Sequence, residues 1–164
     1  MPSGVKSVGA SSFKNCKKIT QFTLPASVET VGAAILSGCE KLTKVSLSLD
    51  HAPPFGYFFG SDNNVSSVFP PNLKSVTVLG NSIGENAFSG CVKLTKVVVL
   101  ESVNSIGVNA FLGCTGLTQV IFEDKQGWEA GEVVLTETEL AGASTCAQYV
   151  NQTYVSVAWT KKGA

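Results

Sequence analysis

Residues 103–122 read VNSIGVNAFLGCTGLTQVIF, and the same order of residue types occurs three more times in this chain of 164 residues. The other copies are VKSVGASSFKNCKKITQFTL (5–24), VETVGAAILSGCEKLTKVSL (28–47) and NSIGENAFSGCVKLTKVVV (81–99). They share the pattern V-x-x-[VI]-G-x-x-[AS]-F-x-x-C-x-x-L-T-x-V-x-L, with Ile35 and Leu36 as the departures in the second copy. An internal repeat of this length determines the fold, so the rest of the chain is interpreted from it.

The cysteines measure the period of the repeat. Those that share one repeat position are Cys16, Cys39, Cys91 and Cys114. The first two and the last two are each 23 residues apart, whereas the middle two are 52 apart, which is 23 plus 29. One altered coil therefore lies in the gap, and LKSVTV (73–78) is its strand half. We predict five coils from about 5 to 122, with an insertion of eight residues in the third coil, at about 48–72.

A unit of 23 residues is too short to bury its own apolar face, so such units stack into a solenoid with a continuous core. The segment L-T-x-V-x-L predicts a short strand, with Val45 and Leu47 pointing inward and Lys44 and Ser46 outward. Stacking then pairs these strands in parallel. The glycine after [VI] suits either a positive φ or a close approach of two backbones. A-F-x-x-C is predicted to form one helical turn that brings Phe and Cys to the interior.

This pattern resembles the BspA-like, treponemal-type class of bacterial leucine-rich repeats, in which I-G-x-x-A-F-x-x-C-x-x-L-x-x-V-x-[LI]-P recurs every 23 residues. The resemblance implies an α/β repeat fold, a right-handed superhelix with a curved parallel sheet on its concave side, over residues 1–122. It also implies a non-enzymatic module for protein binding or adhesion, in a bacterial protein that is secreted or at the cell surface. A structural spacer that has no ligand of its own is the alternative.

Residues 123–164 leave the repeat, and we expect them to cap the exposed end of the last coil. GWEAGEVVLTETEL (127–140) predicts a strand or hairpin. We expect Ser144 or Thr145 to begin a short helix. The helix would carry Cys146, Tyr149 and Val150 on one side, and the final strand would contain Tyr154 and Trp159.

The composition indicates one folded domain and excludes some classes of partner. Twelve basic and twelve acidic side chains balance, so the net charge suggests neither nucleic acid nor an anionic membrane surface as a partner. The longest apolar run, VVVL (97–100), is far shorter than the roughly 18 residues that span a bilayer. The N-terminus lacks the layout of a secretory signal, which suggests a piece of a longer protein. We expect a monomer with a protein ligand.

No catalytic or cofactor site is predicted. The cysteine column is expected to hold free, buried thiols, because stacked side chains do not aim at one another and zinc would need pairs such as C-x-x-C. His51, the only histidine, follows Asp50 directly, but neighbours in an extended segment point to opposite faces and no nucleophile is placed nearby. SDNNVS (61–66) is interpreted as a turn rather than a calcium loop.

The remaining candidate site is the outer surface of the strands. The outward positions are Gln21, Thr23, Lys44, Ser46, Ser75, Thr77, Lys96, Val98, Gln119 and Ile121. This strip is small and polar, becomes apolar in the last two coils, and lies where solenoids commonly bind. Strand propensity alone would also explain the β-branched residues. In the insertion PFGYFFGSDNN (54–64), we expect Phe58 or Phe59 to fill the core, and Tyr57, Asp62 and Asn63 are the possible ligand contacts.

Overall fold

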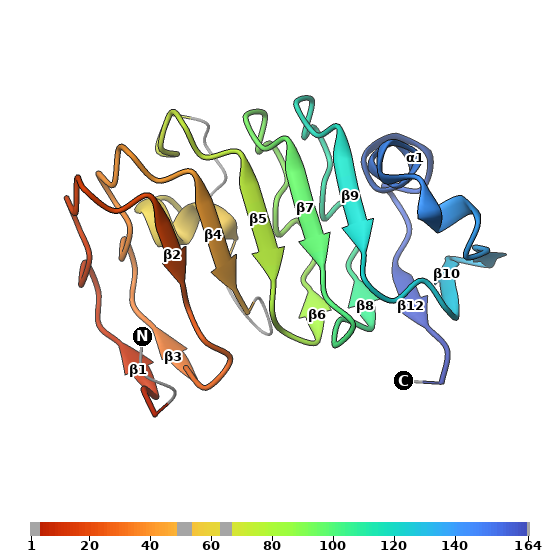
Figure 1. The fold of residues 1–164 in the computed structure, drawn as a ribbon, viewed down its shortest axis with the longest axis horizontal. Coiled ribbons are helices and arrows are strands. Elements are labelled where there is room, and N and C mark those ends of the chain that lie inside the picture. The colour runs from red at the N-terminus through yellow and green to blue at the C-terminus, as the bar shows by residue number, and fades with distance from the viewer. Residues whose placement is uncertain (1–3, 49–53, 63–66, 164) are drawn as a thin grey trace.

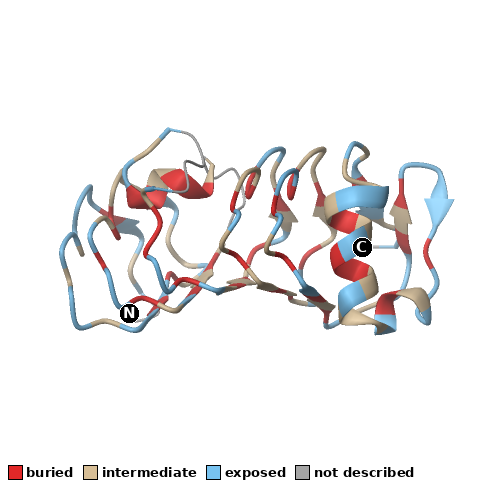
Figure 2. Ribbon diagram, turned by 90° about the horizontal axis from the view of Figure 1, so that it is seen from above, coloured by how far each residue is buried: buried red, intermediate tan, exposed pale blue. Residues whose placement is uncertain are grey.

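The computed structural model describes residues 4–48, 54–62 and 67–163. The predicted solenoid of five coils is confirmed, because each coil contributes one strand to a parallel sheet in the order β2-β4-β5-β7-β9 (Figure 1). The strands are β2 (Gln21–Thr23), β4 (Lys44–Leu47), β5 (Ser75–Val78), β7 (Lys96–Val99) and β9 (Gln119–Phe122). Figure 2 shows that the row of coils is bent, with the sheet along the inner side of the bend. In the described part of the chain, no helix has the length and apolar character needed to cross a membrane.

Neighbouring strands pair without offset, so each residue lies beside its equivalent in the next coil. Val45 pairs with Val76, and Val97 pairs with Val120. These inward valines are at most 1% exposed, whereas the outward positions next to them are half-buried or exposed. The predicted alternation of inward and outward residues is therefore confirmed, and the inward rows form the core.

Short strands on the other side of the coils precede the repeat glycine. They are β1 (Ser7–Val8), which pairs with β3 (Thr30–Val31), and β6 (Ser82–Ile83), which pairs with β8 (Ser105–Ile106). A β-carbon built on Gly107 would lie 2.4 Å from the backbone nitrogen of Glu85, and one on Gly32 would lie 2.2 Å from that of Ala10. Neither glycine has a positive φ. Close approach of adjacent backbones is thus the reason for glycine here.

The A-F-x-x-C segment does not form the predicted helical turn. Two residues of each complete coil adopt the left-handed conformation, which interrupts a helix. The first lies two positions after the repeat glycine and is Ser11, Ala34, Asn86 or Asn109; the second is Asn15, Gly38, Gly90 or Gly113. Cys91 N donates to Phe88 O at 3.0 Å, which is the i→i−3 bond of a tight turn. The predicted interior placement holds in this coil, since Phe88 and Cys91 are both buried.

The insertion in the third coil contains a 3₁₀ helix, η1 (Phe55–Phe59), that bridges two coils. The carbonyls of Tyr57 and Phe58 accept hydrogen bonds from backbone amides of the second coil. The amide of Phe55 donates to Ala87 O of the fourth coil at 2.9 Å. The short helix therefore continues the coil-to-coil backbone pairing where the repeat pattern is lost.

The aromatic side chains of η1 fill the core of the third coil. Phe55, Phe58 and Phe59 are 1–2% exposed, whereas Tyr57 is only half-buried. The Phe55 ring lies 5.1 Å from the Phe88 ring of the next coil, measured between centroids. The predicted core-filling role is therefore confirmed, and it involves both Phe58 and Phe59.

Residues after 122 form two small layers against the last coil. The elements are β10 (Trp128–Ala130), β11 (Val133–Val134), η2 (Glu139–Ala141), α1 (Ala143–Gln148), the π-helical η3 (Tyr149–Thr153) and β12 (Trp159–Lys161). Helix α1 lies against β9, and β12 pairs antiparallel with β8 and with β10 (Figure 1). The division into a solenoid, 1–122, and a capping segment, 123–164, stays a prediction.

Two local predictions for this segment are wrong. Gly142, rather than Ser144 or Thr145, precedes α1. A capping-box arrangement lies earlier, at the start of η2, where Thr136 N donates to Glu139 Oε2 at 2.8 Å and Glu139 N donates to Thr136 Oγ1 at 3.2 Å. Tyr154, predicted in the final strand, is instead the C-cap of η3 and precedes that strand, which contains Trp159 as predicted.

Asp124 holds the start of this segment to its last strand. Its Oδ2 lies 2.5 Å from Lys161 Nζ, and its Oδ1 accepts a hydrogen bond from Gln126 N at 3.0 Å. The Asp124 carbonyl accepts the indole N–H of Trp128 at 3.0 Å. The hydrogen bond from Lys161 and the backbone bond from Gln126 lower the pKa of the Asp124 carboxyl.

The substitution Gly107→Ala should destabilise the fold, because its methyl group would collide with the backbone of the fourth coil. We expect a loss of about 1–3 kcal/mol in the free energy of unfolding, the usual cost of overpacking, measured by urea denaturation. Gly9→Ala is the matched control, since the repeat glycine of the first coil has only Ser12 Oγ, at 3.6 Å, near the added carbon. Equal losses in both variants would contradict the close-approach explanation.

Asp124→Asn should remove part of the acid sensitivity of the protein. Because the native pKa of Asp124 is lowered, its ionised form stabilises the fold above the ordinary Asp pKa, and this contribution is lost as pH falls through the native pKa. In a series of melting temperatures from neutral to acidic pH, the variant should be less stable at neutral pH and should converge with the parent at the acidic end. Glu123→Gln, which removes the neighbouring exposed carboxyl, should keep the parent profile.

Candidate functional site

The ten predicted outward residues lie on one face of the main sheet. They form two rows that cross the strands, Gln21-Lys44-Ser75-Lys96-Gln119 and Thr23-Ser46-Thr77-Val98-Ile121. Figure 1 views this sheet face. Because adjacent strands of a sheet are about 4.8 Å apart, each row is a line of closely spaced side chains. We call this surface the sheet face.

The chemistry of the sheet face changes from coil to coil. Lys44 and Lys96 lie on either side of Ser75 in the first row, and neither row contains an acidic residue. In the second row, Val98 pairs directly with Ile121, and both are half-buried. The face therefore presents two cations in its middle coils and an apolar pair toward α1.

A threonine ladder beside the strands was missing from the sequence interpretation. Thr43 Oγ1 donates to Thr20 O at 2.9 Å, and Thr118 Oγ1 donates to Thr95 O at 3.3 Å. Each hydroxyl bonds a carbonyl of the preceding coil, so the repeated threonine has a structural role. The sequence does indicate this ladder, because a threonine follows Leu or Ile at the same position in all four complete copies of the repeat.

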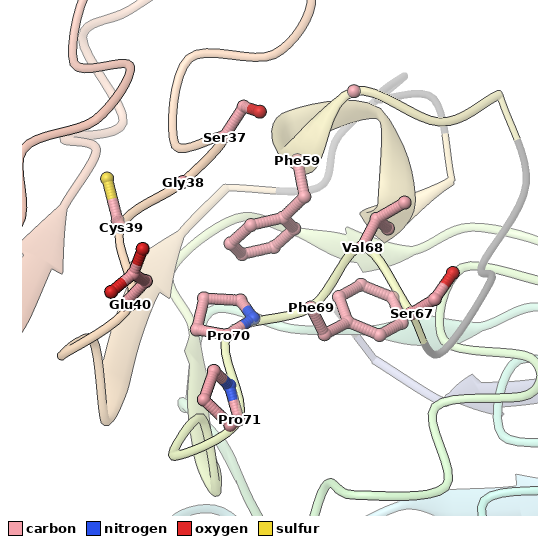
Figure 3. Close-up of a pocket in the computed structure, with 11 residues that line it drawn as sticks. Ser37, Gly38, Cys39, Glu40, Phe59, Ser67, Val68, Phe69, Pro70 and Pro71 are labelled. Atoms are coloured by element: carbon pink, nitrogen blue, oxygen red, sulfur yellow. The ribbon is translucent and has the colours of Figure 1, made fainter.

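The insertion creates a hollow of about 430 Å³ between the second coil and its own return segment (Figure 3). It is lined by Ser37, Gly38, Cys39, Glu40, Phe59, Gly60, Ser67, Val68, Phe69, Pro70 and Pro71. The amides of Asn15 and Gly90 donate to the next coil, but the equivalent amide of Gly38 has no such partner among the described residues. This hollow depends on the path of the insertion, so the repeat pattern could not predict it.

A second hollow, of about 240 Å³, lies between α1 and the start of β9. Its lining is Leu117, Thr118, Ser144, Ala147, Gln148, Asn151 and Gln152. Asn151 Nδ2 donates to Cys114 O at 3.1 Å and so holds part of the wall in place. No lining residue is ionisable, so the hollow presents only uncharged polar and apolar side chains.

The other predicted contacts and catalytic candidates are only partly described. Tyr57 packs edge-on against Phe58, with ring centroids 6.4 Å apart, and Asp62 is exposed. Asn63, His51 with Asp50, and residues 63–66 of the proposed turn lie outside the described residues. Within the described ranges, no group of three or more His, Cys, Asp or Glu could hold a metal ion.

The cysteine column is free of disulfides but not uniformly buried. Cys39 Sγ donates to Phe13 O at 3.2 Å, and Cys114 Sγ donates to Phe88 O at 3.0 Å. Burial raises the pKa of the Cys114 thiol to about 12. Cys16 is half-buried, so the prediction of a buried thiol is wrong there. In the described chain no coil covers the first one from the N-terminal side, which explains the difference.

Comparison with known families gives the class of this protein. The profile of the family described as the BspA type leucine rich repeat region matches in six copies, over residues 1–81 and 81–140. The chain belongs to this family of BspA-type leucine-rich repeat proteins. A comparison with curated protein sequences finds no match.

Solved structures of leucine-rich repeat proteins are similar to this chain. A leucine-rich repeat protein from Bacteroides ovatus shares 26% identity, with a TM-score of 0.46, over 72% of this chain and 28% of that protein. The leucine rich repeat protein of T. pallidum shares 26% identity, with a TM-score of 0.35, over 73% of this chain and 56% of that protein. A leucine rich cell surface protein from Faecalibacterium prausnitzii shares 21% identity, with a TM-score of 0.29, over 76% of this chain and 34% of that protein. The similar region thus covers little more than half of the T. pallidum protein and about a third or less of the other two.

Thiol labelling should separate Cys16 from the other cysteines. In native protein at pH 8, we expect a maleimide to modify Cys16 within minutes, because the four remaining thiols are buried and burial raises their pKa. The other four should react only after denaturation. Peptide mass spectrometry after timed quenching identifies the modified cysteine, and Cys16→Ser should abolish the fast phase. A fast phase that survives in Cys16→Ser would contradict this arrangement.

Proposed function

We propose that this chain is a non-enzymatic module that binds a protein ligand through its sheet face and so supports adhesion. The observation that carries the proposal is the direct pairing of Val98 with Ile121 on the outer side of the sheet. Both side chains are half-buried, so each keeps part of its apolar surface accessible to solvent. Apolar side chains that lie together on a surface favour contact with another protein. Repeats of this family generally serve as binding or structural modules rather than as enzymes.

The shape and chemistry of the sheet support this role. The sheet lies on the inner side of the bend, the surface that solenoids commonly use for binding (Figure 2). Cys91 and Cys114 favour no catalytic role, because buried thiols with a raised pKa supply little nucleophilic thiolate.

We also propose that the chain works at the cell surface or as part of a secreted protein. The support is membership of the family of BspA-type leucine-rich repeat proteins. Binding there would place the sheet face in contact with proteins of the surroundings.

A structural spacer without a ligand is the second candidate, and the third coil favours it. The insertion could have presented an aromatic loop to a partner. Instead, Phe55, Phe58 and Phe59 are almost fully buried. A spacer needs this packing and does not need the apolar pair on the sheet face, so the two candidates differ over Val98 and Ile121.

The double variant Val98→Glu/Ile121→Glu should lose ligand binding. Immobilised extracellular-matrix proteins form the test panel, and biolayer interferometry measures binding of the parent and the variants. Two carboxylates in place of the apolar pair remove apolar contact and add desolvation cost, so we expect binding to weaken by about a hundred-fold or more, or roughly 3 kcal/mol.

Val92→Glu/Leu112→Glu is the matched control for this experiment. These residues are also apolar, are 41% and 44% exposed, and lie in the same two coils but off the sheet face. Circular dichroism and thermal unfolding confirm that both double variants fold. If both variants bind as the parent does, the sheet face is not the binding surface, and if no matrix protein binds the parent, the spacer is favoured.

A further inference from the structure

The first row of the sheet face places two lysines on either side of a serine. Lys44 pairs with Ser75, and Ser75 pairs with Lys96, all without offset. With strands about 4.8 Å apart, the Cα atoms of the two lysines are about 10 Å apart across the small serine. Two flexible ammonium groups can therefore converge on one anionic group above Ser75.

Among the described residues, these two lysines form no salt bridge, whereas four other lysines do. The four salt bridges between described residues join Lys6 to Glu29, Lys17 to Glu40, Lys161 to Asp124 and Lys162 to Glu129. None includes Lys44 or Lys96, and no Asp or Glu occupies either row of the sheet face. The chain has no net charge, yet this part of its surface is positive. Charge complementarity favours an anionic group of the ligand at this point.

The apolar pair determines what else the ligand must carry. The midpoint of Val98 and Ile121 lies one and a half strands from Ser75 and two residues farther along the strands. Strand spacings of about 4.8 Å and a rise of about 3.3 Å per residue put this midpoint about 10 Å from Ser75. A polyproline II segment rises about 3.1 Å per residue with three residues per turn, so its side chains i and i+3 face the same way about 9 Å apart.

We propose that the sheet face binds an extended acidic peptide segment of the partner protein. A carboxylate of the segment lies between Lys44 and Lys96, above Ser75, and an apolar side chain three positions away packs on Val98 and Ile121. This inference rests on the proposed function, because it specifies the ligand class of the same surface.

A protein segment fits this surface better than a sulfated polysaccharide does. Only two of the ten outward positions are cationic, whereas a polysaccharide with a sulfate on most residues needs a run of basic side chains. No aromatic ring lies in either row to stack on a sugar, and the apolar pair would be left without a partner.

The test uses the unlabelled peptide Ac-Pro-Asp-Pro-Pro-Leu-Pro-amide, with the whole chain labelled with ¹⁵N. NMR titration should shift the backbone amides of Lys44, Ser75, Lys96 and Ile121 and give a dissociation constant. Replacing Asp by Asn or Leu by Ser in the peptide should weaken binding about ten-fold each, and raising the salt concentration should weaken binding of the Asp peptide more than binding of the Asn peptide.

Lys44→Ala/Lys96→Ala should lose the preference for the Asp peptide over the Asn peptide. Lys41→Ala/Lys93→Ala is the matched control, because it removes two lysines from the same two coils, each three positions before the strand lysine. This control should keep the preference. Equal affinity of the parent for the Asp and Asn peptides, or an unchanged preference in Lys44→Ala/Lys96→Ala, would overturn the inference. So would binding of a sulfated heparin oligosaccharide without binding of the peptide.

Failure of this inference can be distinguished from failure of the proposed function. If a matrix protein binds the parent and Val98→Glu/Ile121→Glu abolishes that binding, the sheet face remains a binding surface whatever the peptide does. Absence of peptide binding in that case overturns only the acidic ligand class. If neither the peptide nor any matrix protein binds, both proposals fail.

Discussion

In-register pairing of backbone groups between successive coils is the constraint on which the rest of the structure depends. Val45 pairs with Val76, and Val97 pairs with Val120, so one repeat position becomes one straight row through the molecule. The apolar rows make the core, the cysteine column lies beside them, and the threonines bond the carbonyls of the preceding coil. A coil cannot shift alone, because a change of register by one residue would turn every side chain of its strand to the other face.

The third coil shows how the fold meets this constraint when the repeat changes length. After its longer path, the third coil must bring Ser75 back into register with the strand of the second coil. Within the insertion, η1 forms backbone hydrogen bonds with the second coil at one end and with the fourth coil at the other. The buried phenylalanines replace the lost Phe and Cys of the repeat. Among the described residues, the amide of Gly38 has no backbone partner in the next coil, and the hollow in Figure 3 lies beside it. One insertion thus supplies both a core and a surface depression.

The repeat period was sufficient to predict the five strands, their parallel order and the inward and outward positions, because stacking equivalent residues leaves little freedom. It could not predict features that depend on one backbone angle or one neighbour. Asn86 and Asn109 are residue types that tolerate the left-handed conformation, but Ala34, at the same position, gives no such signal. Cys16 matches its column in sequence and differs in burial, because burial depends on the adjacent coil rather than on the residue. The main outward rows were predictable as a surface, whereas the hollows required the path of the insertion and the position of α1.

The same geometry separates the chemistry of the sheet face from the stability of the fold. Inward positions of the strands are filled almost entirely by Val, Leu and Phe, while the outward row beside them runs from Thr23 through Ser46 and Thr77 to Val98 and Ile121. An outward residue contacts its row neighbours and solvent rather than the core, so its replacement costs little folding free energy. Because the strands lie in the sheet in the order in which they occur in the chain, the second row has hydroxyl groups at one end of the sheet and apolar groups at the other. A ligand that recognised both kinds of group would therefore bind in one direction along the solenoid, without any additional element to orient it.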